Sequence, residues 1–197
     1  DAVVAVASQR ELPLWLGLGR MYRGAALVEG GLADADPPRI AEGVAEGRCG
    51  LAKYRATGAG LDAPACLCWL AVGHTRLREA GEAARLLEEA RRVIVDTGES
   101  YFAAELQRTT GELAAATAGT AGPAAAESYL RAALATARRQ GAKLLELRAG
   151  VSLARLWLQH GRRGPGRELL AGLSASFVAG TTSVDLTEAL TLLAALA

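Results

Sequence analysis

The stretch AARLLEEARRVIVDTG, residues 83–98, holds the pattern that decides the fold of this chain. Two small residues, Ala83 and Ala90, stand seven positions apart with Leu87 between them, and the stretch ends on Gly98. Residues seven apart lie on one face of a helix, where small side chains let a neighbouring helix approach closely. A glycine after the last turn supplies the positive φ that a helix C-cap prefers. The stretch therefore predicts the second helix of a packed helix hairpin.

The same pattern recurs along the chain and predicts a repeat. Comparable stretches end at Gly58, Gly98, Gly141 and Gly180, at intervals of 40, 43 and 39 residues. Counted back from these glycines, the residue at fifteen is never bulky: Gly43, Ala83, Ala126, Pro165. The residue eight positions before each glycine is always small: Gly50, Ala90, Ala133, Gly172. The residue eleven positions before each glycine lies between these two positions: Gly47, Leu87, Leu130, Leu169. Packing positions that repeat with the glycines indicate four similar hairpins.

We expect one all-α helical-repeat domain over residues 1–197. Its parts are the end of a preceding repeat at 1–12, hairpins at 13–58, 63–98, 101–141 and 143–180, and a capping helix at 184–197. The first helices are expected at Pro13 to Gly30, Pro64 to Ala80, Tyr101 to Ala118 and Lys143 to His160, with ends near Gly31, Gly81, Gly119 and Gly161. Pro13, Pro64, Pro123 and Pro165 fall near helix starts, whereas Pro37 and Pro38 are expected in a loop. Because the pattern begins within a repeat, we expect a piece of a longer array.

Composition favours a folded helical protein and gives little reason to expect nucleic acid or a membrane as partner. Hydrophobic residues make up 51% of the chain and aromatic residues 5%, and the formal net charge is +1. No segment has eighteen apolar residues without a charge. The run from Arg138 to Arg167 carries eight Lys or Arg residues against Glu146 alone, which we interpret as solvated helix flanks.

The few residues able to carry chemistry do not form a recognisable catalytic or metal-binding motif. Cys66 and Cys68 are two positions apart, so on a helix they point about 200° apart, and zinc requires converging ligands. His74 and His160 belong to different hairpins, which disfavours a shared general-base site. We expect no catalytic residue, metal or cofactor. The odd count of three cysteines favours reduced thiols in a cytoplasmic protein.

Three segments carry a family resemblance. KLLELRAGVSLARLWLQHGRRGPGRELLAGL (143–173), YRATGAGLDAPACLCWLA (54–71) and AELQRTTGEL (104–113) resemble the C-terminal tetratricopeptide-repeat region of bacterial adenylate/guanylate cyclase-like AAA-type signalling ATPases. The resemblance implies a tetratricopeptide-like superhelix, an α-solenoid, that acts as a regulatory or assembly module. The chain contains no phosphate-binding G-x-x-x-x-G-K-[ST] motif, so cyclase or ATPase activity is not carried over.

In tetratricopeptide stacks the first helices line a concave groove, which makes their polar faces the candidate surface for a protein or peptide partner. The candidates by helical spacing are His74 with Arg78, Glu105 with Arg108 and Glu112, and Arg148 with Arg155. The plainer interpretation is a set of exposed charges that keeps the helices soluble. Trp15, Trp69 and Trp157 are expected to pack between repeats.

The functional hypothesis is a non-catalytic scaffold that holds a protein or peptide segment, in cis from a larger signalling protein or in trans. One alternative is a ligand-sensing module for a small molecule or peptide. Another is a structural oligomerisation unit, a homo-oligomer formed through an uncapped repeat end. Sequence alone does not identify the partner.

Overall fold

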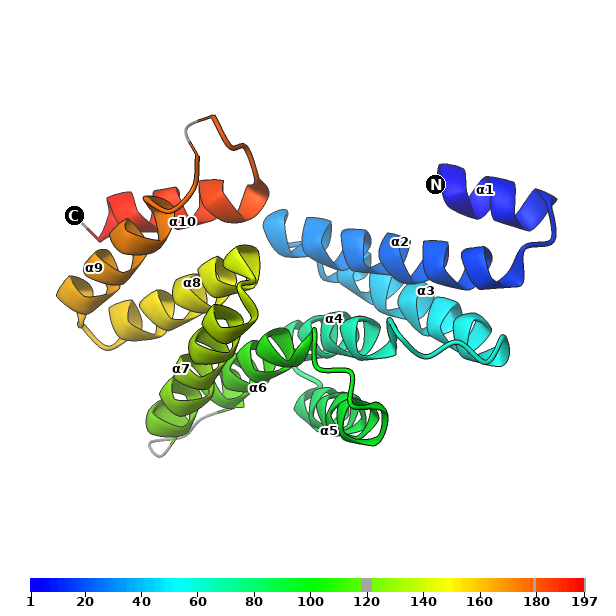
Figure 1. The fold of residues 1–197 in the computed structure, drawn as a ribbon, viewed down its shortest axis with the longest axis horizontal. Coiled ribbons are helices and arrows are strands. Elements are labelled where there is room, and N and C mark those ends of the chain that lie inside the picture. Colours follow the sequence, from blue (N-terminus) through cyan, green and yellow to red (C-terminus); the bar gives the residue numbers. More distant parts are fainter. Residues whose placement is uncertain (118–121, 179, 197) are drawn as a thin grey trace. The chain divides into compact units, whose positions relative to one another are not determined.

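The computed structural model describes residues 1–117, 122–178 and 180–196, and these residues form ten α-helices and no strand, which confirms the all-α prediction. The helices are α1 (Ala2–Gln9), α2 (Pro13–Ala33), α3 (Pro37–Ala56), α4 (Ala63–Arg76), α5 (Ala80–Thr97), α6 (Ala103–Thr117), α7 (Gly122–Gln140), α8 (Lys143–Gln159), α9 (Arg163–Ser174) and α10 (Val184–Ala195). The chain divides into two compact units, Asp1–Ser100 with α1 to α5 and Tyr101–Ala197 with α6 to α10 (Figure 1). Within the described residues, no helix has the length and apolar character needed to cross a bilayer.

The antiparallel pair α2 and α3 is packed backbone against backbone in the first unit. Glycines seven apart on α2 face the second helix: a Cβ added at Gly24 would lie 2.5 Å from the backbone nitrogen of Gly47. A Cβ at Gly17 would lie 2.5 Å from the backbone nitrogen of Tyr54, so the close approach extends along the pair. Such contacts leave no room for any side chain, which explains why glycines rather than alanines occupy this seam.

Prolines and one carboxylate set where these helices begin. Pro13 lies in the first turn of α2, and Pro37 and Pro38 form the first turn of α3. The Asp36 side chain caps α3 by accepting a hydrogen bond from the backbone N–H of Arg39 at 3.2 Å. The expectation that Pro37 and Pro38 lie in a loop is therefore wrong, because a proline needs no N–H partner at the start of a helix.

The repeated glycines adopt the backbone conformation that their positions predict. Gly58, Gly98, Gly141 and Gly180 all have positive φ, between 65° and 87°, as does Gly161 at 74°. Two other glycines were expected to end helices and do not: Gly31 lies inside α2 and Gly81 inside α5. Helix α4 ends at Arg76 instead of near Ala80, and Gly119 lies outside the described residues.

The fourth hairpin departs from the predicted packing register by one residue. Pro165 and Gly172 are exposed on α9, and nothing lies within 4 Å of a Cβ added at Gly172. The buried positions are Gly166, Leu170 and Leu173 instead. Gly180 follows the end of α9 by six residues, so it does not cap that helix, and counting back from it misplaces the buried face.

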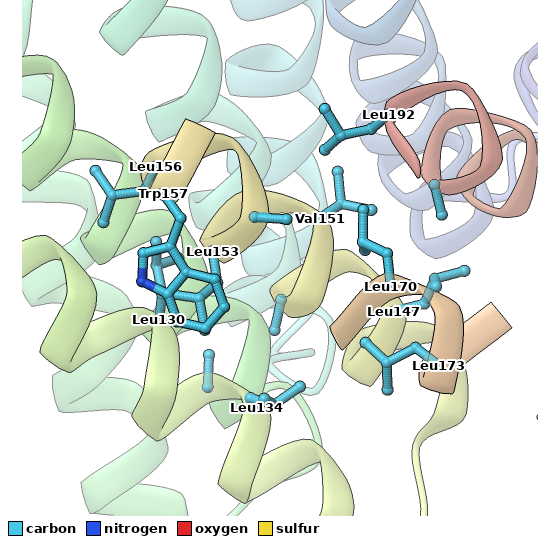
Figure 2. Close-up of a cluster of buried hydrophobic side chains, with 14 of the residues drawn as sticks. Leu130, Leu134, Leu147, Val151, Leu153, Leu156, Trp157, Leu170, Leu173 and Leu192 are labelled. Atoms are coloured by element: carbon cyan, nitrogen blue, oxygen red, sulfur yellow. The ribbon is translucent and has the colours of Figure 1, made fainter. Parts of the chain in front are cut away.

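The core of the second unit is centred on α8. Leu147, Val151, Leu153 and Trp157 of this helix are buried against the neighbouring helices. Figure 2 shows Leu130 and Leu134 of α7, Leu170 and Leu173 of α9, and Leu192 of α10 arranged around α8. Because α8 touches α6, α7, α9 and α10, its polar side chains lie close to those of several helices.

Candidate functional site

A cluster of charged side chains links α6, α8 and α10 in the second unit. On α6, the Arg108 guanidinium donates to both carboxylate oxygens of Glu105, at 2.9 Å and 2.6 Å. Its Nη1 also donates to Oε1 of Glu112 at 2.6 Å. The spacing of three and four residues brings these groups onto one helix face, as the sequence predicts.

Helix α8 joins the cluster through Ser152 and Arg148. The Ser152 hydroxyl donates to Oε1 of Glu112 at 2.7 Å. Nη1 of Arg148 lies 3.9 Å from Oε1 of Glu105, and the same guanidinium donates to Asp185 of α10 at 2.7 Å and 3.2 Å. Arg148 therefore stands between one carboxylate on α6 and another on α10.

Glu105 is buried and charged. Its residue is 2% exposed, and the removal of water opposes ionisation. Attraction to Arg108, the hydrogen bonds from Arg108 and attraction to Arg148 outweigh that effect and hold the pKa of Glu105 below its usual value. A buried carboxylate in this state depends on its arginines, because a buried charge without a partner is costly.

The residues chosen from sequence separate into two places. Glu105, Arg108, Glu112 and Arg148 share the cluster, and Arg155 forms an ion pair with Glu188 of α10. His74 and Arg78 belong to the first unit.

The prediction that His74 and Arg78 share a helix face is wrong. Helix α4 stops at Arg76, and Arg78 lies in the turn with a φ of 62°. The His74 ring is buried, and its Nδ1 lies 2.5 Å from Oε2 of Glu79, at the start of α5. This pairing spans the turn between the two helices, where Arg78, a residue other than glycine, holds the positive φ.

Sequence reasoning missed the two carboxylates that α10 contributes, Asp185 and Glu188. Asp185 and Glu188 are three residues apart on α10 and face arginines seven apart on α8. Charged residues of opposite sign at helical spacing on two segments are a weak signal, because many pairs of segments in this chain satisfy it. Only the packing of α10 against α8 selects these four residues.

The first unit carries a different surface, an open hollow of about 560 Å³ beside α1 and α2. Helix α1 runs back along the first half of α2, with Val3 and Val4 against Gly19 (Figure 1). Apolar side chains line the hollow: Val3, Trp15, Leu18, Tyr22, Ala26, Leu27. Trp15 is 53% exposed and Tyr22 50%, unusually high values for large aromatic side chains.

Aromatic and basic groups frame this hollow. The Tyr22 ring lies 5.2 Å from the Trp69 ring of α4, between ring centroids. Arg23 and Arg39 also line the hollow, and each has an acidic neighbour of its own. Arg39 Nη1 lies 2.5 Å from Asp34, whereas the distances from Arg23 to Asp1 and Glu46 are 3.4 Å and 3.8 Å. Because the Asp1 carboxylate also lines the hollow, its apolar floor is edged by charged groups of both signs.

Trp157 of α8 packs in the core against α7 of the preceding hairpin, as expected for packing between repeats, whereas Trp15 is exposed and does not fit that expectation. The Trp157 ring lies under the guanidinium groups of Arg131 and Arg162, 5.2 Å and 5.1 Å from the ring centroid. Glu127 forms ion pairs with both arginines at 2.8 Å. The cluster joins α7, α8 and the turn after α8, and its aromatic face is already covered.

The basic run between Arg138 and Arg167 does not form one patch. Arg138 and Lys143 lie where α7 meets α8, whereas Arg162 and Arg167 lie at and beyond the far end of α8. The 17 residues of α8 separate these ends by about 25 Å. Arg138 pairs with Glu146 across the first junction at 2.6 Å.

The cysteines are free thiols and show no sign of a metal centre. Cys66 and Cys68 are buried and Cys49 is partly exposed. Burial raises the pKa of Cys66 to about 12, so its thiol is protonated at neutral pH. Within the residues that the structure describes, no three His, Cys, Asp or Glu side chains converge as metal ligands would.

No family model, curated protein or solved structure matches this chain. The resemblance to the tetratricopeptide-repeat region of cyclase-like ATPases therefore stays a prediction. Over the described residues, the molecule is an all-helical protein with a paired charged face in one unit and an open aromatic hollow in the other.

Proposed function

We propose that this chain is a non-catalytic scaffold that binds a segment of another protein. We also propose that it is a tetratricopeptide-like regulatory module of a larger bacterial signalling protein, in the cytoplasm. Three segments that resemble such modules support the second part, and the free cysteines fit a reducing compartment.

The observation that carries the scaffold proposal is the exposed aromatic hollow of the first unit. Trp, Tyr and Arg are the residue types most enriched where proteins bind tightly, and Trp15, Tyr22, Arg23 and Arg39 meet there. Isolated exposed apolar residues are ordinary, but an apolar hollow rimmed by charges is typical of an interaction site. The partner segment should bring apolar side chains onto Trp15 and Tyr22.

The polar clusters support a role without catalysis. The Ser152 hydroxyl donates to Glu112, and the His74 ring lies against Glu79. Ser152 is 6% exposed and His74 5%, so neither group faces a substrate-sized opening. These hydrogen-bonded groups hold helices together. Serine and histidine also serve as catalytic residues in enzymes, but here their role is structural.

Residue-specific photo-crosslinking in the native organism tests the proposal. A benzoylphenylalanine placed at position 15, in the hollow, should give one or a few discrete protein adducts. The matched control is the same residue at position 129, because Tyr129 is 45% exposed on α7 of the other unit. Adducts that are absent at position 15, or identical at both positions, would contradict a partner site in the hollow.

A small-molecule sensor is the second candidate, favoured by the size of the same hollow. About 560 Å³ lies within the usual range of ligand sites, roughly 300–1,000 Å³. A ligand in the hollow would raise the melting temperature of the wild-type chain. An Ala26→Glu variant should lose that shift, because Ala26 is an exposed residue of the lining.

A further inference from the structure

We propose that the segment bound in the aromatic hollow is an amphipathic α-helix of about three turns that lies along α2 beside α1. The inference rests on the proposed scaffold function and specifies the secondary structure and chemistry of the partner segment. One face of this helix carries apolar side chains toward α2, and the opposite face is polar and stays in water.

The backbone around the hollow argues against an extended partner segment. Seven of the ten residues that line the hollow belong to α2, whose N–H and C=O groups bond one another along the helix. Helix α2, described over its whole length, therefore offers no free edge at which another segment could form sheet-like hydrogen bonds. An extended segment on this apolar floor would lose water from its own N–H and C=O groups without replacing those bonds. A helix bonds its own backbone groups and avoids this cost.

The side chains of the hollow are spaced as a facing helix requires. Trp15 and Tyr22 are seven residues apart on α2, and a small residue follows each of them by four, Gly19 and Ala26. Bulky and small residues therefore alternate along one face of α2, at intervals of four, three and four. The side chains of a second helix pack into the spaces above the small residues, between the bulky ones.

Helix α1 shows the packing mode, and the exposed part of α2 beyond it is the open site. A Cβ added at Gly19 would lie 3.0 Å from Cγ1 of Val3 and 3.2 Å from Cγ2 of Val4. Helix α1 thus places branched side chains at the first small residue of the pattern. Val3 itself is still 54% exposed, and the second small residue, Ala26, is exposed as well. A partner helix can therefore contact α1 and α2 together.

Arg39 of α3 sets the length of the partner helix. A Cβ added at Gly30 would lie 2.6 Å from Nη2 of Arg39, so this side chain lies across α2 at the end of the hollow. The ion pair of Arg39 with Asp34 holds it there. The lining residues of α2 run from Trp15 to Leu27, which spans about 18 Å along the helix axis. A helix of about 12 residues covers that distance.

Selection from two matched libraries of displayed peptides on the immobilised full chain tests this inference. In the first library, four randomised apolar positions lie at intervals of four, three and four in a frame of Glu, Lys and Ala, which favours one apolar helix face. The control library has the same composition, but its randomised positions alternate with polar ones, as in an extended strand. Enrichment should come from the first library.

Fluorescence anisotropy on synthetic copies of the enriched peptides then identifies the bound conformation and the site. A proline substituted near the middle of the peptide should weaken binding at least tenfold, because it breaks a helix but is compatible with an extended segment. Ala26→Glu in the chain should weaken binding by a similar factor, whereas Tyr129→Ala, on α7 of the other unit, should leave it unchanged.

Two results would overturn the helical partner while leaving the scaffold function in place. One is preferential enrichment of the alternating library. The other is enriched peptides that tolerate the central proline but still lose affinity with Ala26→Glu. If neither library is enriched, or if binding does not respond to Ala26→Glu, the hollow is not the site and both proposals fail.

Discussion

Gly24→Ala is expected to lower the free energy of unfolding of the first unit by about 2 kcal/mol, although alanine is the better helix former. The new Cβ would lie 2.5 Å from the Gly47 nitrogen and 2.7 Å from the Gly43 oxygen. These are backbone atoms, so α2 and α3 must separate, and overpacking of this kind costs roughly 1–3 kcal/mol. Two close backbone contacts place Gly24 near the upper end of that range, at about 3 kcal/mol. The greater helix propensity of alanine offsets about 1 kcal/mol of this cost.

Urea unfolding followed by far-ultraviolet circular dichroism measures this effect. The matched control is Gly81→Ala, because Gly81 is also a helical glycine of the first unit and nothing lies within 4 Å of its added Cβ. That change should leave stability unaltered or raise it by up to about 1 kcal/mol. Equal effects of the two substitutions would mean that α2 and α3 are not in backbone contact.

Arg108→Met is expected to destabilise the second unit by about 3–5 kcal/mol at neutral pH, because it leaves a buried carboxylate without its main partner. Among the residues that the structure describes, Glu105 would keep its ion pair with Arg148, at 3.9 Å. The double variant Glu105→Leu with Arg108→Met should lose much less, since no buried charge remains. Arg91→Met breaks an exposed pair with Glu88 and should leave the stability almost unchanged.

The pH dependence gives a second test of the same pair. In the wild type, the pKa of Glu105 lies below its usual value, so this carboxylate stabilises the fold above pH ~4.3. That contribution is lost as the pH falls through the lowered pKa. Without Arg108, burial raises the pKa of Glu105, and protonation then relieves the penalty. The difference between variant and wild type should therefore shrink as pH falls from 7 toward 4.

A single tryptophan can report these changes. Trp157 is the only tryptophan of the second unit, because Trp15 and Trp69 belong to the first. In a background with both of those replaced by phenylalanine, fluorescence follows the unfolding of the second unit. A destabilisation by Arg108→Met that does not depend on pH would contradict the ionised state of Glu105.

The helix pattern was predictable where it depends on local spacing. Ala83, Leu87 and Ala90 are buried on one face of α5, as their separations require, and Gly98 takes the left-handed conformation after it. The end of α4 was not predictable in this way. There a buried histidine pairs with Glu79 and Arg78 takes the positive φ, so no glycine marks the turn.

The candidate sites were harder to predict because they depend on contacts between distant segments. The spacing of Glu105, Arg108 and Glu112 predicted their grouping, since all three lie on one helix. Asp185 meets Arg148 across 37 residues of sequence, and only packing of α10 on α8 brings them together. The hollow beside Trp15 likewise depends on where α1 lies along α2, which no local pattern encodes.

Selection of displayed peptides on the immobilised chain tests whether the first unit binds a protein segment in its aromatic hollow. Enriched peptides should lose at least tenfold in affinity with Trp15→Ala or Ala26→Glu. They should keep their affinity with Tyr129→Ala or Ala135→Glu, matched exposed positions on α7. If no peptides are enriched, or if they bind all four variants equally, the hollow is not a site for a protein segment.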